Sequence, residues 1–169
     1  MNTHYGFLML KYATPYMIET LHRDIDPNDV YKIDDKDYGL EKETHVTLAP
    51  CLDNNITVVE LKRFLNPINS YSASVSELSM FECDDYDVLK YDVTCQALKD
   101  TNAKIGMYYK MHTEHKYHPH MTVAYMKKGC AKKYLLPRYK FFPTLYVIPK
   151  NFIWSYYDTA DEQQRINFL

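Results

Sequence analysis

The feature of this sequence that most limits its possible folds is a short pattern that occurs twice. In each copy a histidine is followed two residues later by a threonine, with apolar residues in the intervening and following positions. The first copy is His45-Val-Thr47, and the second, His120-Met-Thr122, begins 75 residues further along. Recurrence of the same unit indicates two related lobes, as duplication of a lobe would produce.

Each copy has the spacing of a β-strand with one polar face. Residues two apart in a strand point to the same side, so the histidine and threonine share a face while their apolar neighbours point into the core. Two such strands side by side would form a cleft. We therefore expect His45, Thr47, His120 and Thr122 to converge on one small anion.

Two imidazoles and two hydroxyls are the groups that phosphodiester cleavage needs when no metal takes part. One neutral imidazole removes a proton from the attacking oxygen, and one imidazolium protonates the leaving oxygen. Histidine suits both roles because its unperturbed pKa is about 6.5. The threonine hydroxyls can hydrogen-bond the non-bridging oxygens in the transition state. The pattern thus predicts a catalytic pair that uses neither a metal nor another cofactor.

The remaining sequence predicts short strands and helices without strict alternation. Strands are expected over residues 5–12, 44–48, 70–81, 87–94, 119–126, 145–148 and 152–157. Helices are expected over residues 16–21, 57–65, 96–105 and 131–136. The acidic stretch 24–42 has neither period and indicates a long loop, a candidate lid. We predict an α+β fold with two lobes, each a small, largely antiparallel sheet, around a central cleft.

Size and composition favour one globular domain over residues 1–169. The chain is 46% hydrophobic and 25% charged, and its four scattered cysteines form no C-x-x-C pair, so free thiols are expected. No apolar run approaches the roughly 18 to 20 residues that span a bilayer, and no signal-peptide pattern is present. We expect a cytoplasmic protein with no membrane partner. Its oligomeric state is left open.

The charge distribution bears on the substrate. A net charge of −2 argues against long nucleic acids as partners. Residues 126–140 carry six basic and no acidic side chains, whereas residues 24–43 carry eight acidic side chains against three lysines. This asymmetry could draw a small anion to one side, and two ordinary solvated faces would explain it equally well.

The two patterns lie in stretches that resemble a known superfamily. These are Tyr-Gly-Leu-Glu-Lys-Glu-Thr-His45-Val-Thr47-Leu and Tyr-His-Pro-His120-Met-Thr122-Val-Ala-Tyr. They resemble the two-histidine (2H) phosphoesterases, whose two pseudo-symmetric lobes each contribute a His-x-Thr/Ser strand to a central cleft. Within that superfamily the chain is most similar to small phage anti-CBASS phosphodiesterases. That resemblance implies hydrolysis of 3',5' phosphodiester bonds in cyclic di- or trinucleotide immune signals, in the host bacterial cytoplasm.

The resemblance also implies two aromatic residues that sandwich a base at the cleft. The matching positions are Tyr12, at the end of the first predicted strand, and Trp154, in the last. Stacking on an aromatic face tolerates any base and contributes about 1 to 3 kcal/mol. Both residues could instead belong to the core, which is where large aromatic side chains are often found.

Other readings of the sequence predict different chemistry. His112, His115 and His118 together with His120 could bind zinc, although strand alternation divides the set. Cys51 lies near the first pattern but lacks a recognisable activating group. No P-loop or Rossmann motif occurs. Within the superfamily the alternative is a 2',3'-cyclic phosphodiesterase or RNA end-processing enzyme. The non-enzymatic alternative is a nucleotide sponge, a protein that binds and sequesters a nucleotide without cleaving it.

Overall fold

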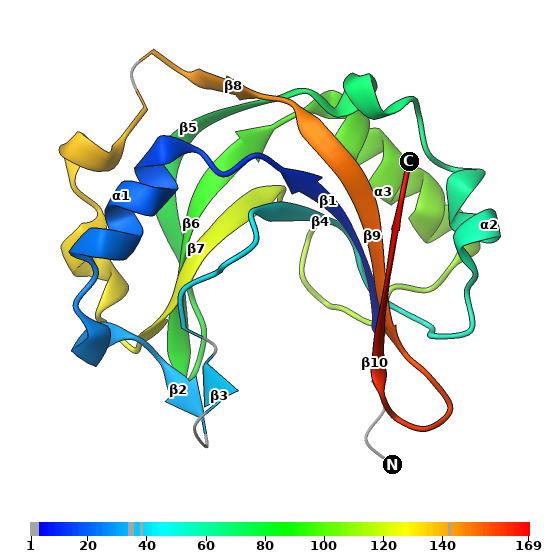
Figure 1. The fold of residues 1–169 in the computed structure, drawn as a ribbon, viewed down its shortest axis with the longest axis horizontal. Coiled ribbons are helices and arrows are strands. Elements are labelled where there is room, and N and C mark those ends of the chain that lie inside the picture. The colour runs from blue at the N-terminus through cyan, green and yellow to red at the C-terminus, as the bar shows by residue number, and fades with distance from the viewer. Residues whose placement is uncertain (1–3, 34–35, 38, 142) are drawn as a thin grey trace.

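Two four-stranded antiparallel sheets lie side by side and form an arch, with helices at its outer flanks (Figure 1). This computed structural model describes residues 4–33, 36–37, 39–141 and 143–169. Each sheet contains one of the two His-x-Thr strands, and these two strands are neighbours at the centre of the arch. The predicted α+β architecture with two lobes is confirmed.

The first sheet has the strand order β10-β9-β1-β4. Its strands are β1 (Gly6–Tyr12), β4 (His45–Leu52), β9 (Pro149–Tyr157) and β10 (Gln163–Phe168). Strand β4 alternates as predicted, because Val46 and Leu48 are fully buried while His45 and Thr47 are only partly buried. Antiparallel pairing places Lys11 of β1 directly opposite His45, on the same polar face.

The second sheet has the strand order β7-β6-β5-β8. Its strands are β5 (Ala73–Glu82), β6 (Tyr86–Thr94), β7 (His120–Lys127) and β8 (Leu145–Val147). Met121 and Val123 of β7 are fully buried, so this strand also turns its apolar residues to the core. On its other face, Asp92 of β6 pairs with His120, and Lys90 pairs with Thr122.

Each of the two main helices follows a strand of one lobe and packs against the sheet of the other lobe. Helix α1 (Tyr16–Asp24) follows β1 of the first sheet but packs against β7 of the second. Helix α3 (Gln96–Tyr108) follows β6 of the second sheet but packs against β4 of the first. Each histidine strand is therefore supported by a helix from the other half of the chain. The hydrophobic core is continuous across both sheets as a result.

The remaining elements are short. They are α2 (Val58–Lys62), η1 (Pro27–Asp29), η2 (Ile68–Tyr71), η3 (Ala131–Tyr134), η4 (Pro137–Tyr139), β2 (Lys32–Ile33) and β3 (Lys36–Asp37). The predicted capping box is present at α2, where Thr57 and Glu60 bond each other's backbone N–H. No helix in the described part of the chain is long and apolar enough to cross a membrane.

Two segments differ from the sequence-based expectation. The stretch 24–42 is not one continuous loop: it contains η1, β2 and β3, and Val30 and Leu40 form isolated bridges to β7. Residues 34, 35 and 38 of this stretch lie outside the described residues. Strand β10 was not predicted, because an edge strand with solvent on much of its surface lacks the apolar alternation that identifies a strand.

Close packing at Gly6 leads to a prediction about stability. A Cβ atom on Gly6 would lie 2.1 Å from Cη2 of Trp154, whose ring is buried in the core. We expect Gly6→Ala to lower the free energy of unfolding by about 1 to 3 kcal/mol through overpacking. Gly106→Ala is the matched control: its Cβ would be 3.5 Å from Met111 Cε, and alanine favours the helix by about 0.5 to 1 kcal/mol. Urea denaturation of both variants measures the difference, and equal stability would contradict it.

Candidate active site

The two histidines of the repeated pattern occupy equivalent places in their lobes. His45 begins β4 and His120 begins β7, the two neighbouring strands at the centre of the arch. The segment before β7 also runs along β4: the Tyr117 hydroxyl donates to the Thr47 carbonyl over 3.0 Å. The positive charge that the His45 imidazole can carry contributes to lowering the pKa of His120. The structure thus brings the predicted pair into one site.

Both imidazoles are held by the same hydrogen bond. Nδ1 of His45 lies 2.8 Å from the Glu43 carbonyl oxygen, and Nδ1 of His120 lies 2.7 Å from the His118 carbonyl oxygen. A carbonyl can only accept, so each Nδ1 carries the proton and donates it. Each Nε2 is therefore the nitrogen left for chemistry: it accepts a proton when the ring is neutral and donates one when the ring is charged.

The two threonines lie beside the histidines on the polar faces. Thr47 is half-buried, and Thr122 is 8% exposed. Within the described residues, neither hydroxyl has a protein hydrogen-bond partner. Each hydroxyl can therefore donate to an oxygen of a bound anion without first breaking a bond inside the protein.

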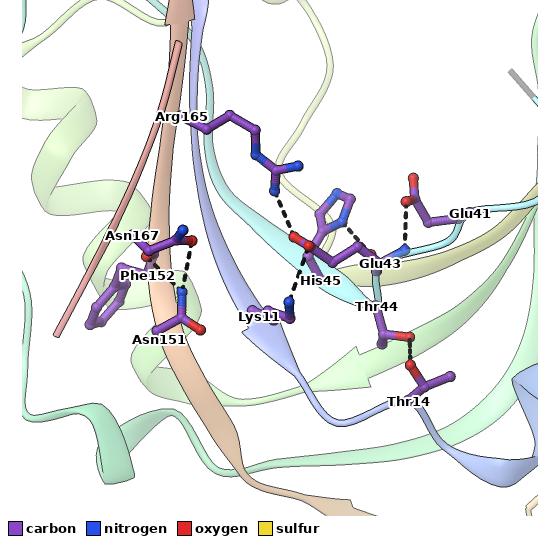
Figure 2. A network of polar contacts seen from close by, with 10 residues as sticks. All are labelled: Lys11, Thr14, Glu41, Glu43, Thr44, His45, Asn151, Phe152, Arg165 and Asn167. Carbon is purple, nitrogen blue, oxygen red and sulfur yellow. Dashed lines mark hydrogen bonds and ion pairs between the residues drawn. The ribbon is translucent and has the colours of Figure 1, made fainter. Parts of the chain in front are cut away.

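Glu43 links His45 to two basic residues (Figure 2). Its carboxylate accepts from Lys11 Nζ at 3.1 Å and from Arg165 Nη2 at 2.6 Å, while its backbone carbonyl accepts from His45. Burial alone would raise the pKa of the Glu43 carboxyl, but the hydrogen bonds from Lys11 and Arg165 outweigh it, and the pKa lies below its usual range. Arg165 belongs to β10, so the C-terminal strand reaches the site.

This ion pair predicts part of the acid sensitivity of the fold. Because the pKa of Glu43 is lower in the folded protein than in the unfolded chain, its contribution is complete above the unfolded pKa and is lost as the pH falls through the folded one. We expect Glu43→Gln to flatten the decline in unfolding free energy below about pH 4.5. Urea titrations from pH 7 to pH 3 measure this slope. An unchanged slope in the variant would contradict the assignment.

A second polar cluster lies behind His120. Asp92 Oδ1 accepts from Lys90 Nζ at 2.5 Å, from His118 Nε2 at 2.8 Å and from Ser79 Oγ at 3.0 Å. Burial would raise the pKa of Asp92, but the hydrogen bonds from Lys90 and His118 outweigh it, so the pKa is lowered and Asp92 is ionised. The Phe81 ring stands at 90° to the His120 ring, with 5.0 Å between centroids.

The surroundings of His120 disfavour its charged form. Burial is the main reason that its pKa is lowered, and the charges of Lys90, His118 and His45 act in the same direction. The hydrogen bond to the His118 carbonyl opposes them and is outweighed. His120 is therefore neutral near pH 7, with a lone pair on Nε2.

Tyr12 and Trp154 are not at the site. Both are 1% exposed and lie in the hydrophobic core. Trp154 pairs with Leu8 in the sheet and shares its buried face, on the side opposite His45 and Thr47. The Tyr12 hydroxyl donates to the Tyr71 carbonyl at 2.8 Å, and burial raises its pKa. The structure does not offer either ring face to a base.

The residues considered for a zinc site or a nucleophilic thiol have other surroundings. The His112 ring stacks on Tyr5, and its Nε2 lies 3.0 Å from Asp53 Oδ1. His115 is exposed in the loop before β7. Across the described ranges, no three side chains of the metal-ligating types come together. Burial raises the pKa of the Cys51 thiol, which disfavours a nucleophilic thiolate.

The sequence patterns do not identify five charged residues of the site: Lys11, Glu43, Lys90, Asp92 and Arg165. Lys90 and Asp92 are two residues apart in a predicted strand, so alternation alone could have placed them on one face. What the sequence lacked was the pairing of β6 with β7, which sets that face beside His120.

These features define a two-lobed α+β fold of two antiparallel sheets, each of which contributes one His-x-Thr strand. A solved structure of Usb1 from Kluyveromyces marxianus has the same overall fold, with a TM-score of 0.51 at 11% sequence identity, covering 96% of this chain and 97% of that chain. A structure of Kluyveromyces marxianus Usb1 with uridine monophosphate gives a TM-score of 0.50 at 12% identity, covering 99% and 100%. No protein-family model matches the sequence, and no curated protein matches it either.

Proposed function

We propose that this protein is a metal-independent phosphodiesterase in which His45 and His120 transfer the protons. The observation that carries the proposal is the matched pair of Nδ1 hydrogen bonds to backbone carbonyls. These bonds orient two imidazoles in the same way on neighbouring strands and leave both Nε2 atoms for substrate. General acid–base catalysis by positioned histidines needs this geometry first and a suitable pKa second.

In the proposed reaction His120 is the base and His45 is the acid. Nε2 of neutral His120 takes the proton of the attacking oxygen, which is a water or the ribose 2'-hydroxyl beside the phosphate. That oxygen bonds to phosphorus while the bond to the leaving oxygen breaks, and His45 gives its Nε2 proton to the leaving oxygen. Thr47 and Thr122 donate to the non-bridging oxygens, whose negative charge increases in the transition state.

We propose a cyclic di- or trinucleotide as the substrate, so that the enzyme counters the CBASS defence of bacteria. The two motifs that resemble anti-CBASS phosphodiesterases support this substrate. A compact substrate also suits the site, because its charges are nearly balanced: Lys11 and Arg165 share the carboxylate of Glu43, Lys90 pairs with Asp92, and the three cations exceed the two carboxylates by one. Such a site attracts one or two phosphates rather than a long polyanion.

The basic run, which consists of the six basic residues between positions 126 and 140, gives little support to a long RNA substrate. Five of its six cations form ion pairs: Lys128 with Asp87, Lys132 with Glu82, Lys133 with Asp29, Arg138 with Asp24 and Lys140 with Glu77. A cation already paired with a carboxylate gains less from a phosphate. The run is therefore not a free cationic surface along which a nucleic acid backbone could bind.

A second candidate substrate is a short RNA ending in a 2',3'-cyclic phosphate. The observation in its favour is the similar fold of Kluyveromyces marxianus Usb1, which has been solved with uridine monophosphate. The same acid–base pair would open that ring by attack of water. The mechanism is shared, so the substrate distinguishes the two functions.

A turnover assay in excess EDTA tests the proposal. Wild type, His45→Ala and His120→Ala are each incubated with cyclic di- and trinucleotides and with RNA ending in a 2',3'-cyclic phosphate. We expect wild type to open the cyclic oligonucleotides in the presence of EDTA, and we expect both variants to have lost this activity. Cleavage of the RNA alone would transfer the function to RNA ends. Tight binding without cleavage would leave a nucleotide sponge, and loss of turnover in EDTA would refute the metal-independent mechanism.

A further inference from the structure

A buried lysine lies beside the catalytic strand without taking part in the reaction described above. Lys90 is 2% exposed, near the middle of β6, and its register partner on β7 is Thr122. Taking an ammonium group out of water is costly unless it is paired, and replacing a buried ion pair with apolar residues is often neutral or stabilising. The stability of the fold therefore gives little reason for a charge at this position.

The contacts of Lys90 form a continuous path to His120. Its Nζ donates to Asp92 Oδ1 at 2.5 Å and to Ser79 Oγ at 2.7 Å, and it lies 4.2 Å from the centroid of the Phe81 ring. Asp92 Oδ1 also accepts from Nε2 of His118. The backbone carbonyl of His118 accepts from Nδ1 of His120. Lys90 and Phe81 thus enclose the cluster that holds the imidazole.

We infer that Lys90 is a positioning residue that orients His120 through Asp92 and His118 and keeps its imidazole in the basic form. The inference rests on the proposed role of His120 as the general base. The ammonium group of Lys90 balances the negative charge of Asp92. The carboxylate can therefore hold the His118 ring without raising the proton affinity of His120. The carbonyl of the fixed His118 then receives Nδ1–H.

The charges that face His120 come from three directions. Lys90 and Asp92 lie on β6, His118 lies two residues before it, and His45 lies on β4. The three basic groups disfavour a proton on His120, and the carboxylate of Asp92 favours one. Removing the charge of Lys90 leaves Asp92 uncompensated, so both changes raise the affinity of His120 for a proton.

Lys90→Met tests this inference because it keeps a long unbranched side chain, one atom shorter than lysine, and removes its charge. We expect the titration midpoint of His120, followed by NMR of the imidazole, to move to higher pH. The acid limb of the kcat/KM profile should move with it, and kcat should fall about 10- to 100-fold as the ring loses its orientation. Lys90→Arg keeps the charge and should restore the midpoint. Lys132→Met, which removes an exposed lysine of the same lobe, should leave the midpoint unchanged.

The titration midpoint of His120 distinguishes this inference from the proposed function, because its measurement needs no substrate. An upward shift in a protein that cleaves nothing would support the role of Lys90 and refute the phosphodiesterase. An active enzyme in which Lys90→Met leaves the midpoint unchanged would overturn the inference alone. If Lys90→Met does not fold, Asp92→Asn decides: it keeps the lysine and removes the carboxylate, so the midpoint should move to lower pH, and an unchanged midpoint would overturn the inference.

Discussion

Replacing either histidine of the pair with alanine is expected to lower kcat by about 10²- to 10⁴-fold, the range that a positioned general acid or base contributes. His45→Ala should remove the proton donor for the leaving oxygen, and His120→Ala should remove the acceptor for the attacking oxygen. Each side chain is only partly buried at the start of its strand, so the fold should survive both changes. Circular dichroism and urea denaturation verify that it does.

The pH profile distinguishes the two variants. Wild type should give a bell-shaped profile of kcat/KM, with the acid limb set by His120, whose pKa is lowered by burial and by neighbouring positive charge. His120→Ala should lose that limb while a residual rate remains. His115→Ala is the matched control, since this histidine is exposed in the loop before β7 and should leave kcat unchanged. Full activity in His45→Ala or His120→Ala would refute the mechanism.

Removing the hydroxyl of Thr47 or Thr122 should give the second largest loss, about 10²- to 10³-fold in kcat for each valine variant. That is the range for deleting one donor to the developing charge of a transition state. KM should change less than kcat, because the hydrogen bonds strengthen as charge develops on the phosphate oxygens. Initial rates over a range of substrate concentrations separate the two parameters.

Thr44→Val serves as the control for the threonine variants. Thr44 is next to His45, but it is almost fully buried, and its hydroxyl donates to the Thr14 hydroxyl at 3.0 Å (Figure 2). Its loss should reduce stability by about 0.5 to 1.5 kcal/mol and leave kcat near that of wild type. Equal losses of kcat in Thr44→Val and Thr47→Val would show that the effect is structural.

The strand pattern of the two motifs was readable from the sequence because it is local. Side-chain direction alternates along every strand, so the apolar positions of β4 and β7 predicted which face carries each histidine. Val46, Leu48, Met121 and Val123 are buried as this alternation requires. The same logic identified the capping box of α2, whose partners are three residues apart.

Tyr12 and Trp154 show the limit of that reasoning. An aromatic residue near a strand end could face either a cleft or the core, and its neighbours in sequence do not decide between them. The decision comes from pairing: β1 lies between β4 and β9, and the register puts both rings on the buried face of the sheet. The aromatic ring that does lie against His120 is Phe81, which comes from β5.

The class of fold and the two His-x-Thr strands could be predicted from the sequence, because strand and helix periods depend on residues only a few positions apart. The three-dimensional packing was needed to find that α1 and α3 each pack against the sheet of the other lobe, that β10 brings Arg165 to Glu43, and that Lys90 and Asp92 lie on the strand next to His120. These relations join residues far apart in the chain. They form because the apolar faces of both sheets must be covered together, and no local pattern records which distant segment covers them.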